Sequence, residues 1–443
     1  MEENVQVQVQ DNSPTIDHIL RPISYTSWLF GVGVARPREY SRAITIIVRF
    51  VHLVACTVYM VYGITRIILF GSAVTDTDIM KFTYSMCMMT LFVSSYYNIY
   101  FGIRHYDKWP KLMDRIKELD QEIRNETSIN NQPVKIVEAL AIVTTFVWCP
   151  LFQIAHVLIY NHTNPENINV SDILFYYMVA QSLINNFVFD IVVYLLYYRF
   201  RTINNVICRI KFNKLSDASR IVFKIKRIRK LHNSICHLVN MVNDIHGYHL
   251  LFCSANCFCM IVTTLFIIYT NIVRKNYAYI CVNNIVWIQY AVQFGLMCWI
   301  CSLTRQESDK IGESLCEIVL NSKPMSLDKV NEAGNKSSLE MRSLFVDSEQ
   351  SSNRCCSHNR NYVALEKLLR KNMDRDSIRN EINDFIIQLQ QYRVTFTARD
   401  FFKMNNGLFT KFVEFVITYL VIFIQFYQPP EDTTEVKRPM KIF

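Results

Sequence analysis

Seven long apolar segments dominate this sequence of 443 residues, and they leave few folds open. A helix that crosses a bilayer needs about 20 mostly apolar residues, because each residue rises 1.5 Å and the hydrocarbon layer is about 30 Å thick. The segments that meet this requirement are 44–70, 79–102, 134–160, 173–198, 248–270, 279–303 and 408–427. The pattern predicts an all-α, polytopic membrane protein with seven transmembrane helices.

The distribution of basic residues predicts how these helices are oriented. Of the 47 Lys and Arg residues, 37 fall in four segments, at 1–43, 103–133, 199–247 and 304–407, whereas the remaining connections and the C-terminal tail carry 5. Because positively charged loops stay in the cytoplasm, we expect a cytoplasmic N-terminus and an extracellular C-terminus. The net charge of +9 then reflects topology and contact with membrane lipid, not binding of nucleic acid.

The spans divide the chain into five regions. These are a cytoplasmic tail, a six-helix ligand-sensing region, a cytoplasmic loop, a seventh helix and an extracellular tail, at residues 1–43, 44–303, 304–407, 408–427 and 428–443. Within the loop, the Ser- and Asn-rich part 321–361 is predicted to be a disordered insertion. The part 362–400 is predicted to hold an anchor helix with one apolar seam, formed by Ile378, Ile382, Phe385, Leu389 and Tyr392.

Several classes of protein are disfavoured by what these segments lack. We find no paired carboxylates, Ser–His grouping or phosphate-binding loop in a suitable context, so we expect neither an enzyme nor a bound cofactor. The predicted orientation is opposite to that of G-protein-coupled receptors, and the third span closes with Leu158-Ile159-Tyr160-Asn161 instead of their acidic-Arg-Tyr triplet. The cysteines at 253, 257 and 259 lie on an apolar helix without a second cluster, which favours buried apolar residues over a metal site.

The loop before the fifth span contains a basic stretch, residues 224–230, in which charged and apolar residues alternate. One interpretation is a contact with anionic lipid. The other is a solvated helical extension of the span beneath the membrane, and this is the interpretation that we favour.

The last span carries sparse polar residues at helical spacing. Thr418 and Gln425 are seven residues apart and therefore share a helix face with Ile422. Such a stripe suits the wall of a largely hydrophobic pore. It equally suits contacts between helices, in which each polar group bonds to a neighbour. The spacing alone leaves both interpretations open.

Two motifs of this region resemble those of a known family. Thr418-Tyr419, five apolar residues and Gln425-Phe426 resemble the Thr-Tyr-(five hydrophobic)-Gln-Phe signature of insect gustatory receptors, and the segment 394–405 is similar to their Phe-x-Ala-x-x-Phe segment. The resemblance implies a taste receptor of the plasma membrane, in the dendrite of a sensory neuron. It further implies a ligand-gated, non-selective cation channel, built as a homo- or hetero-tetramer of gustatory receptor subunits and opened by a small-molecule tastant. The insertion 321–361 departs from the family pattern, because that loop is usually shorter.

The resemblance also implies roles for residues of the last span. Those that would line or gate the pore are Phe415, Thr418, Ile422, Gln425 and Phe426, and Tyr419 would pack beside it. Glu414 would lie near the cytoplasmic mouth and attract permeating cations, or it would pair with Lys411, which is the interpretation that we favour.

A ligand pocket is expected between the outer halves of the first six spans. Sites for small molecules combine aromatic walls with a few convergent polar groups, which suits a sugar or an alkaloid. The residues that meet this description are Tyr62, Tyr84, Trp148, Gln153, His156, Tyr176, Tyr177, Gln181, Asn185, Asn283, Asn284, Trp287 and Gln289.

Asn161 and Asn169 each begin an N-glycosylation sequence on the predicted outer face.

An alternative function stays open. It is a seven-helix chemoreceptor of inverted topology that signals through cytoplasmic partners and does not conduct ions itself.

Overall fold

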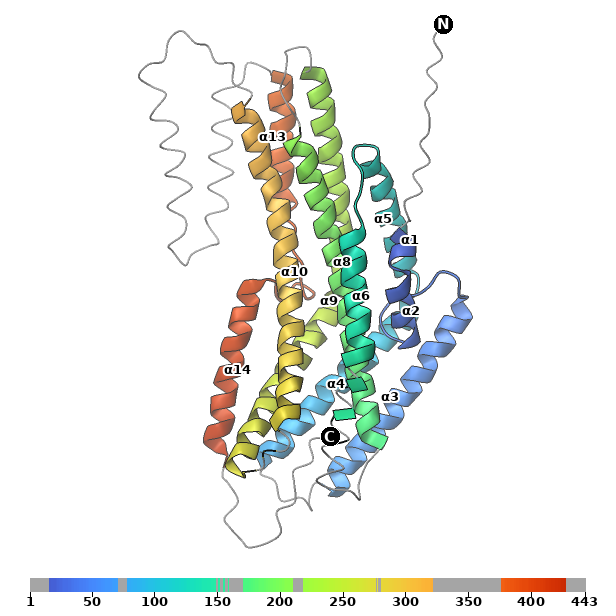
Figure 1. The fold of residues 1–443 in the computed structure, drawn as a ribbon, viewed down its shortest axis with the longest axis vertical. Helices are drawn as coiled ribbons and strands as arrows, with labels where there is room; N and C mark the ends of the chain where they lie inside the picture. The colour runs from blue at the N-terminus through green and yellow to red at the C-terminus, as the bar shows by residue number, and fades with distance from the viewer. Residues whose placement is uncertain are drawn as a thin grey trace, which may run out of the picture.

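The named secondary-structure elements of the described part of the chain are all helices (Figure 1). The computed structural model describes residues 16–70, 78–148, 150–151, 154–155, 158, 170–209, 218–275, 277, 280–321 and 376–427. The elements are α1 (Ile16–Ile19), α2 (Arg21–Leu29), α3 (Arg42–Phe70), α4 (Asp78–Arg104), α5 (Lys108–Arg124), α6 (Gln132–Val143), the π-helical turn η1 (Thr144–Trp148), α8 (Val170–Cys208), α9 (Ala218–Val273), α10 (Ile280–Asn321), α13 (Asp376–Gln391) and α14 (Asn406–Phe426). The all-α prediction is confirmed.

Five helices among the described residues are long and apolar enough to cross a membrane, at Arg42–Thr65, Leu174–Cys208, Arg220–Val273, Asn283–Glu317 and Asn406–Phe426. The other two predicted spans differ from these. The span at 79–102 coincides with α4, and the described part of 134–160 consists of α6, η1 and a few further residues. The count of seven spans and the orientation of the termini stay predictions.

The three longest helices extend far beyond the thickness of a bilayer. α9 alone has 56 residues, which corresponds to about 84 Å at 1.5 Å per residue. The basic stretch 224–230 forms its early turns, so this stretch is part of one continuous helix with the apolar segment that follows. The structure thus agrees with the helical-extension interpretation. Together with α8, α10 and α13, this end of α9 forms a narrow bundle at the top of the molecule in Figure 1.

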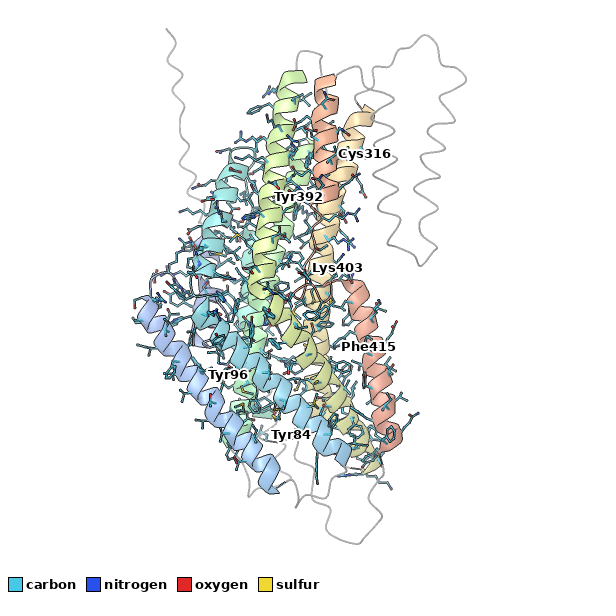
Figure 2. All side chains as sticks on the ribbon, turned by 180° about the vertical axis from the view of Figure 1, so that it is seen from behind. Tyr84, Tyr96, Cys316, Tyr392, Lys403 and Phe415 are labelled. Atoms are coloured by element: carbon cyan, nitrogen blue, oxygen red, sulfur yellow. The ribbon has the colours of Figure 1, made fainter. Side chains whose placement is uncertain are left out.

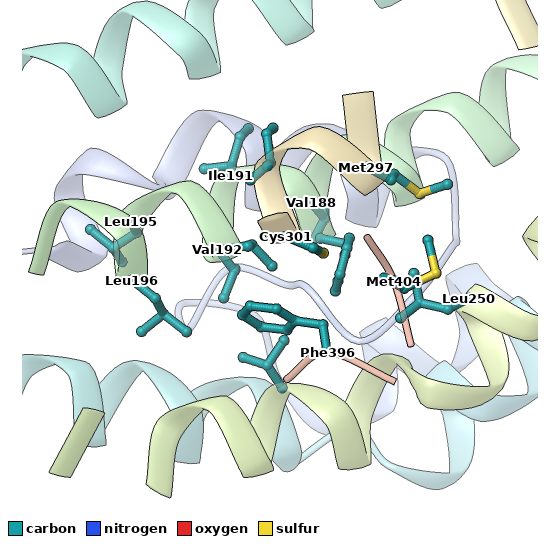
Figure 3. Packing of buried hydrophobic residues seen from close by; sticks show 14 of the residues in the cluster. Val188, Ile191, Val192, Leu195, Leu196, Leu250, Met297, Cys301, Phe396 and Met404 are labelled. Atoms are coloured by element: carbon teal, nitrogen blue, oxygen red, sulfur yellow. The ribbon is translucent and has the colours of Figure 1, made fainter. Parts of the chain in front are cut away.

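α8 forms the centre of the hydrophobic core. It packs against α9 and α10, and Val188, Val192 and Leu196 are fully or almost fully buried. Figure 3 shows these residues beside Leu250 of α9, Met297 and Cys301 of α10, and two residues from the segment between α13 and α14, Phe396 and Met404. The core therefore joins the long helices to the segment that leads into α14.

The N-terminal region, predicted as a tail, contains two helices that are packed into the bundle. α2 contacts α3, α6 and α8. Beyond it, Gly31 and Gly33 adopt φ angles of +67° and +63°, a conformation that favours glycine. A Cβ on Gly31 would lie 2.2 Å from the His52 ring, and one on Gly33 would lie 2.3 Å from Asn185 Oδ1. These glycines let the loop fit closely between α3 and α8.

α13 packs on α9 with the predicted seam turned inward. Ile378, Ile382, Phe385 and Leu389 are buried, but Tyr392 is 51% exposed. The helix ends at Gln391, so the anchor helix predicted for 362–400 is wrong beyond this residue. The segment 394–397 is not helical, and a helix could not continue to residue 400, because Arg399 and Asp400 adopt φ angles of +50° and +62°. This segment instead turns back on itself through a bridge between Thr397 and Lys403.

Candidate functional site

The candidate pore helix is α14, which lies at one side of the bundle (Figure 1). Its start is fixed by Asn405, whose side chain accepts a hydrogen bond from the backbone N–H of Leu408 at 2.8 Å. α14 contacts α9 and α10 through a narrow face that includes Phe412 and Val416, both buried. The Phe412 ring lies 4.2 Å from that of Phe294 on α10. The rest of α14 is largely exposed in the single chain.

The predicted pore residues lie away from this packed face. Phe415 is 59% exposed (Figure 2), and Glu414, Thr418, Ile422, Gln425 and Phe426 are also exposed. Because one residue advances a helix by about 100°, Thr418 and Gln425 project roughly opposite to Phe412 and Val416. Tyr419 differs from them, since its ring packs edge-on against Phe258 of α9 at 5.5 Å.

Glu414 is not paired with Lys411 in the structure, because neither residue takes part in an ion pair within the described part of the chain. The backbone carbonyl of Glu414 accepts a hydrogen bond from the Thr418 hydroxyl at 2.9 Å. Glu414 itself is exposed, on the side of α14 on which Thr418 lies.

An apolar hollow of about 390 Å³ lies between the C-terminal half of α14 and the start of α4. Its lining consists of Ile79, Phe82, Ile422, Phe423 and Phe426. Two of the predicted pore residues, Ile422 and Phe426, thus also face the gap toward α4.

Three of the predicted pocket residues follow one face of α8 and meet the N-terminal segment. Tyr177 and Gln181 both donate hydrogen bonds to the carbonyl oxygen of Phe30, at 3.3 and 2.8 Å. Tyr177 also bonds to the His52 ring of α3. One turn further, Asn185 bonds to His249 of α9 at 2.8 Å. These side chains form a buried polar network that is closed by the loop after α2.

A second group of predicted pocket residues joins η1 to α10. The Trp148 indole N–H donates to Gln289 Oε1 at 3.2 Å, and the Trp287 indole N–H donates to Asn284 Oδ1 at 3.0 Å. Trp148 is 43% exposed, so this group lies nearer to the surface than the network around Tyr177.

The other predicted pocket residues are dispersed. Tyr62 is 48% exposed on α3, whereas Tyr84 is half-buried on α4 near the lower end of the bundle (Figure 2). Tyr176 and Asn283 are buried. Gln153 and His156, and the glycosylation candidates Asn161 and Asn169, lie outside the described residues.

The sequence-based prediction missed a set of buried polar residues in the core. Asn186 and Asp190 of α8 and Gln293 of α10 have side-chain polar atoms without a hydrogen-bond partner among the described residues. Tyr290 of α10 lies beside Asn256 of α9. Periodicity could have indicated the residues of α10, because Tyr290 and Gln293 continue the buried face that starts at Asn283.

The described residues offer polar groups in the interior and no cluster of metal-binding type. No group of three or more side chains of the metal-binding types gathers among them. What the arrangement offers is a set of buried hydroxyl, amide and imidazole groups between helices, next to a separate helix with an exposed, mixed apolar and polar face.

Comparison with solved structures shows the same fold in a receptor from an insect. The chain is similar to the olfactory receptor OR5 of Machilis hrabei, solved both in complex with eugenol and without it. In each case the TM-score is 0.55, the identity is 9%, and the alignment covers 92% of this chain and 97% of the receptor. At this identity the similarity shows the fold alone. A search among curated protein sequences found no match.

A comparison with models of protein families gives the relationship directly. The family model described as 7tm chemosensory receptor matches residues 20–329 and 350–428. This match includes the N-terminal helix α2, which packs into the bundle, the long helices and α14. Because it extends over most of the chain, the protein belongs to the family of 7tm chemosensory receptors, which are receptors and not enzymes.

Proposed function

We propose that this chemosensory receptor is a gustatory receptor that acts as a ligand-gated, non-selective cation channel in the plasma membrane of a sensory neuron. A small tastant, such as a sugar or a bitter plant compound, opens it. The pore is lined by the α14 helices of a homo- or hetero-tetramer, with Phe415, Thr418, Ile422, Gln425 and Phe426 on its wall. Tyr419 packs beside the pore, and Glu414 attracts cations near its cytoplasmic end.

The observation that carries this proposal is the arrangement of α14. A helix with mean hydropathy as high as 1.9 that is almost wholly exposed in the single chain must face lipid or other subunits. Lipid alone does not explain Glu414, Thr418 and Gln425, which follow one another along an exposed side of the helix. Polar groups at this depth are expected to face a water-filled passage or a protein partner. A pore between copies of α14 would cover the apolar surface of the helix and would give its polar groups a water-filled passage to face.

The ligand is proposed to bind between the outer parts of α3, α4, α8 and α10 and the segment that follows α6. The residues in question are Tyr62, Tyr84, Trp148, Gln153, His156, Tyr177, Gln181, Asn185, Asn284 and Trp287. Of these, Trp148 is exposed and Asn284 and Trp287 are half-buried, and their side-chain hydrogen bonds lie where a ligand could exchange with them. Tyr177 and Gln181 are already bonded to Phe30, so a ligand that reaches them must replace these bonds.

Gln425→Ala tests the pore proposal. The amide is expected to contact permeating ions or water, and its loss should shift relative cation permeability or the midpoint of the ligand response by about two- to tenfold, the factor that corresponds to a hydrogen bond of 0.5–1.5 kcal/mol. The measurement is whole-cell current in a non-native cell under a panel of sugars and plant compounds. Val413→Ala, on another side of α14, serves as the control and should leave both quantities unchanged. Unchanged currents and selectivity in Gln425→Ala would remove this residue from the pore wall.

A further inference from the structure

Arg49 of α3 is a buried positive charge without a counter-charge. Its side chain is 0% exposed. One guanidinium nitrogen, Nη1, donates to the carbonyl oxygen of Gly102 on α4, but Nε and Nη2 have no hydrogen-bond partner among the residues that the structure describes. No acidic side chain lies within ion-pair distance of it in the described part of the chain. Burying an unpaired charge is costly, so the arrangement calls for an anion that the described residues do not supply.

Arg36 lies close enough to Arg49 for its charge to act on it, and Arg42 shares an aromatic ring with Arg36. Neither has an ion pair among the described residues. Arg36 donates from Nε to the Tyr106 carbonyl oxygen at 3.0 Å, and its Cζ lies 5.6 Å from the Tyr106 ring centre. Arg42 covers the same ring at 4.4 Å. Burial lowers the pKa of Arg36, and the charge of Arg38 lowers it further. This lack of partners is specific, because neighbouring Arg38 pairs with Asp114 at 2.7 Å.

The described carboxylates near these arginines form ion pairs with other Lys and Arg side chains. Asp107, whose charge acts on Arg36, pairs with Lys111 at 2.5 Å. Asp244 pairs with Lys108 at 2.6 Å, and Glu39 pairs with Arg21. The positive charge at the start of α3 therefore remains uncompensated within the described part of the chain.

The position of these arginines along α3 indicates where the anion comes from. Arg42 is the first residue of α3, and Arg49 follows about 10 Å further along the axis. Side chains of a helix lean toward its N-terminus, so the Arg49 guanidinium is displaced back toward Arg42. In the proposed orientation this end of α3 lies at the cytoplasmic leaflet, which carries anionic phospholipids.

We propose that Arg36, Arg42 and Arg49 bind the phosphate group of an anionic phospholipid of the cytoplasmic leaflet. Guanidinium groups match phosphate in shape and bond to it through two nitrogens at once. Arg42 is exposed, Arg36 is half-buried and Arg49 is buried, so the three present donors from the surface inward. Gly102 has no side chain that could crowd this region, since a Cβ there would lie against the backbone oxygen of Gly33 first and also 3.0 Å from Cζ of Arg49. The proposal uses the proposed membrane orientation but not the channel activity.

The test measures thermal unfolding of the purified full-length protein in a neutral detergent. The probes are short-chain phosphatidylinositol 4,5-bisphosphate, short-chain phosphatidylcholine and inorganic phosphate. We expect the anionic lipid to raise the unfolding temperature and the other two to leave it unchanged. Arg36→Gln and Arg42→Gln should each weaken binding about tenfold, as the loss of a charge-assisted hydrogen bond does. Arg104→Gln removes an exposed arginine from the same end of α4, and it should stay within about twofold of wild type.

The unfolding temperature of Arg49→Met is expected to differ from that of wild type in opposite directions without and with the anionic lipid. A merely structural arginine would not produce this reversal. Without anionic lipid the variant should unfold at a higher temperature than wild type, because it no longer buries an unpaired charge. With anionic lipid it should gain nothing. Lower stability of Arg49→Met in neutral detergent would contradict the proposal. Equal losses in Arg104→Gln, or a shift produced by inorganic phosphate alone, would also contradict it. Arg42→Gln keeps the test valid if Arg49→Met does not fold, since Arg42 is exposed.

Discussion

Arg199→Ala is expected to lower the free energy of unfolding by about 3–5 kcal/mol, because it leaves a buried carboxylate without its partner. Arg199 is 0% exposed, and it bonds to both oxygens of Asp120, from Nε at 2.7 Å and from Nη2 at 2.9 Å. Nη2 also donates to Asn131 Oδ1 at 2.9 Å. One side chain of α8 thus holds both α5 and the segment before α6.

Thermal unfolding of the purified protein, together with the amount of folded protein on size-exclusion chromatography, measures this effect. Arg201→Ala is the matched control, because Arg201 lies two residues further on α8 and is exposed. Replacing both members of the pair, as Arg199→Met with Asp120→Leu, should recover much of the stability that either single change removes. If Arg199→Ala and Arg201→Ala behaved alike, the ion pair would not be what joins these helices.

Phe412→Ala is expected to weaken the docking of α14 by about 3–5 kcal/mol, the usual cost of removing a buried phenylalanine ring. Phe412 is 8% exposed and lies between Phe294 of α10 and Phe258 of α9, with ring centres at 4.2 and 6.0 Å. It is one of only two buried residues within α14 itself. We therefore expect a looser α14, and with it reduced or altered ligand-evoked current.

The matched control for this change is Phe401→Ala, which makes the same substitution at a residue that is 74% exposed and precedes α14. It should change the unfolding free energy by no more than about 0.5 kcal/mol. Unfolding temperature and surface expression separate loss of folding from loss of gating. Wild-type stability and wild-type current in Phe412→Ala would mean that α14 is held by contacts outside the single chain.

The sequence allowed the helices to be predicted because their apolar segments are long. α3, α8, α10 and α14 each contain an apolar segment long enough to cross a membrane, and the length of such a segment indicates a helix. The N-terminal helices could not be found in this way. α2 has only nine residues, and its burial depends on the close fit of Gly31 and Gly33 against α3 and α8. Such contacts join residues far apart in the chain and have no local pattern.

The same distinction applies to the candidate site. The exposed polar side of α14 could be predicted because helical periodicity alone determines which of its residues share a face. The partners of Tyr177 and Gln181 could not, since they depend on how deep the loop after α2 reaches into the bundle. The pairing of Trp148 with Gln289 likewise depends on the relative height of η1 and α10. The prediction that Tyr392 belongs to the apolar seam of α13 was wrong, because the helix ends one residue before it.

The central claim is that α14 lines an aqueous pore, and cysteine accessibility in the expressed receptor tests it most directly. Thr418→Cys and Ile417→Cys are a matched pair, because they lie at the same depth, both are exposed in the single chain, and they project about 100° apart. A water-soluble, membrane-impermeant thiol reagent is applied while ligand-evoked current and labelling are recorded, with the wild-type protein as background for its native cysteines. The pore proposal predicts rapid labelling and block of current at Thr418→Cys and none at Ile417→Cys. Equal labelling of both positions, or labelling of Ile417→Cys alone, would contradict it.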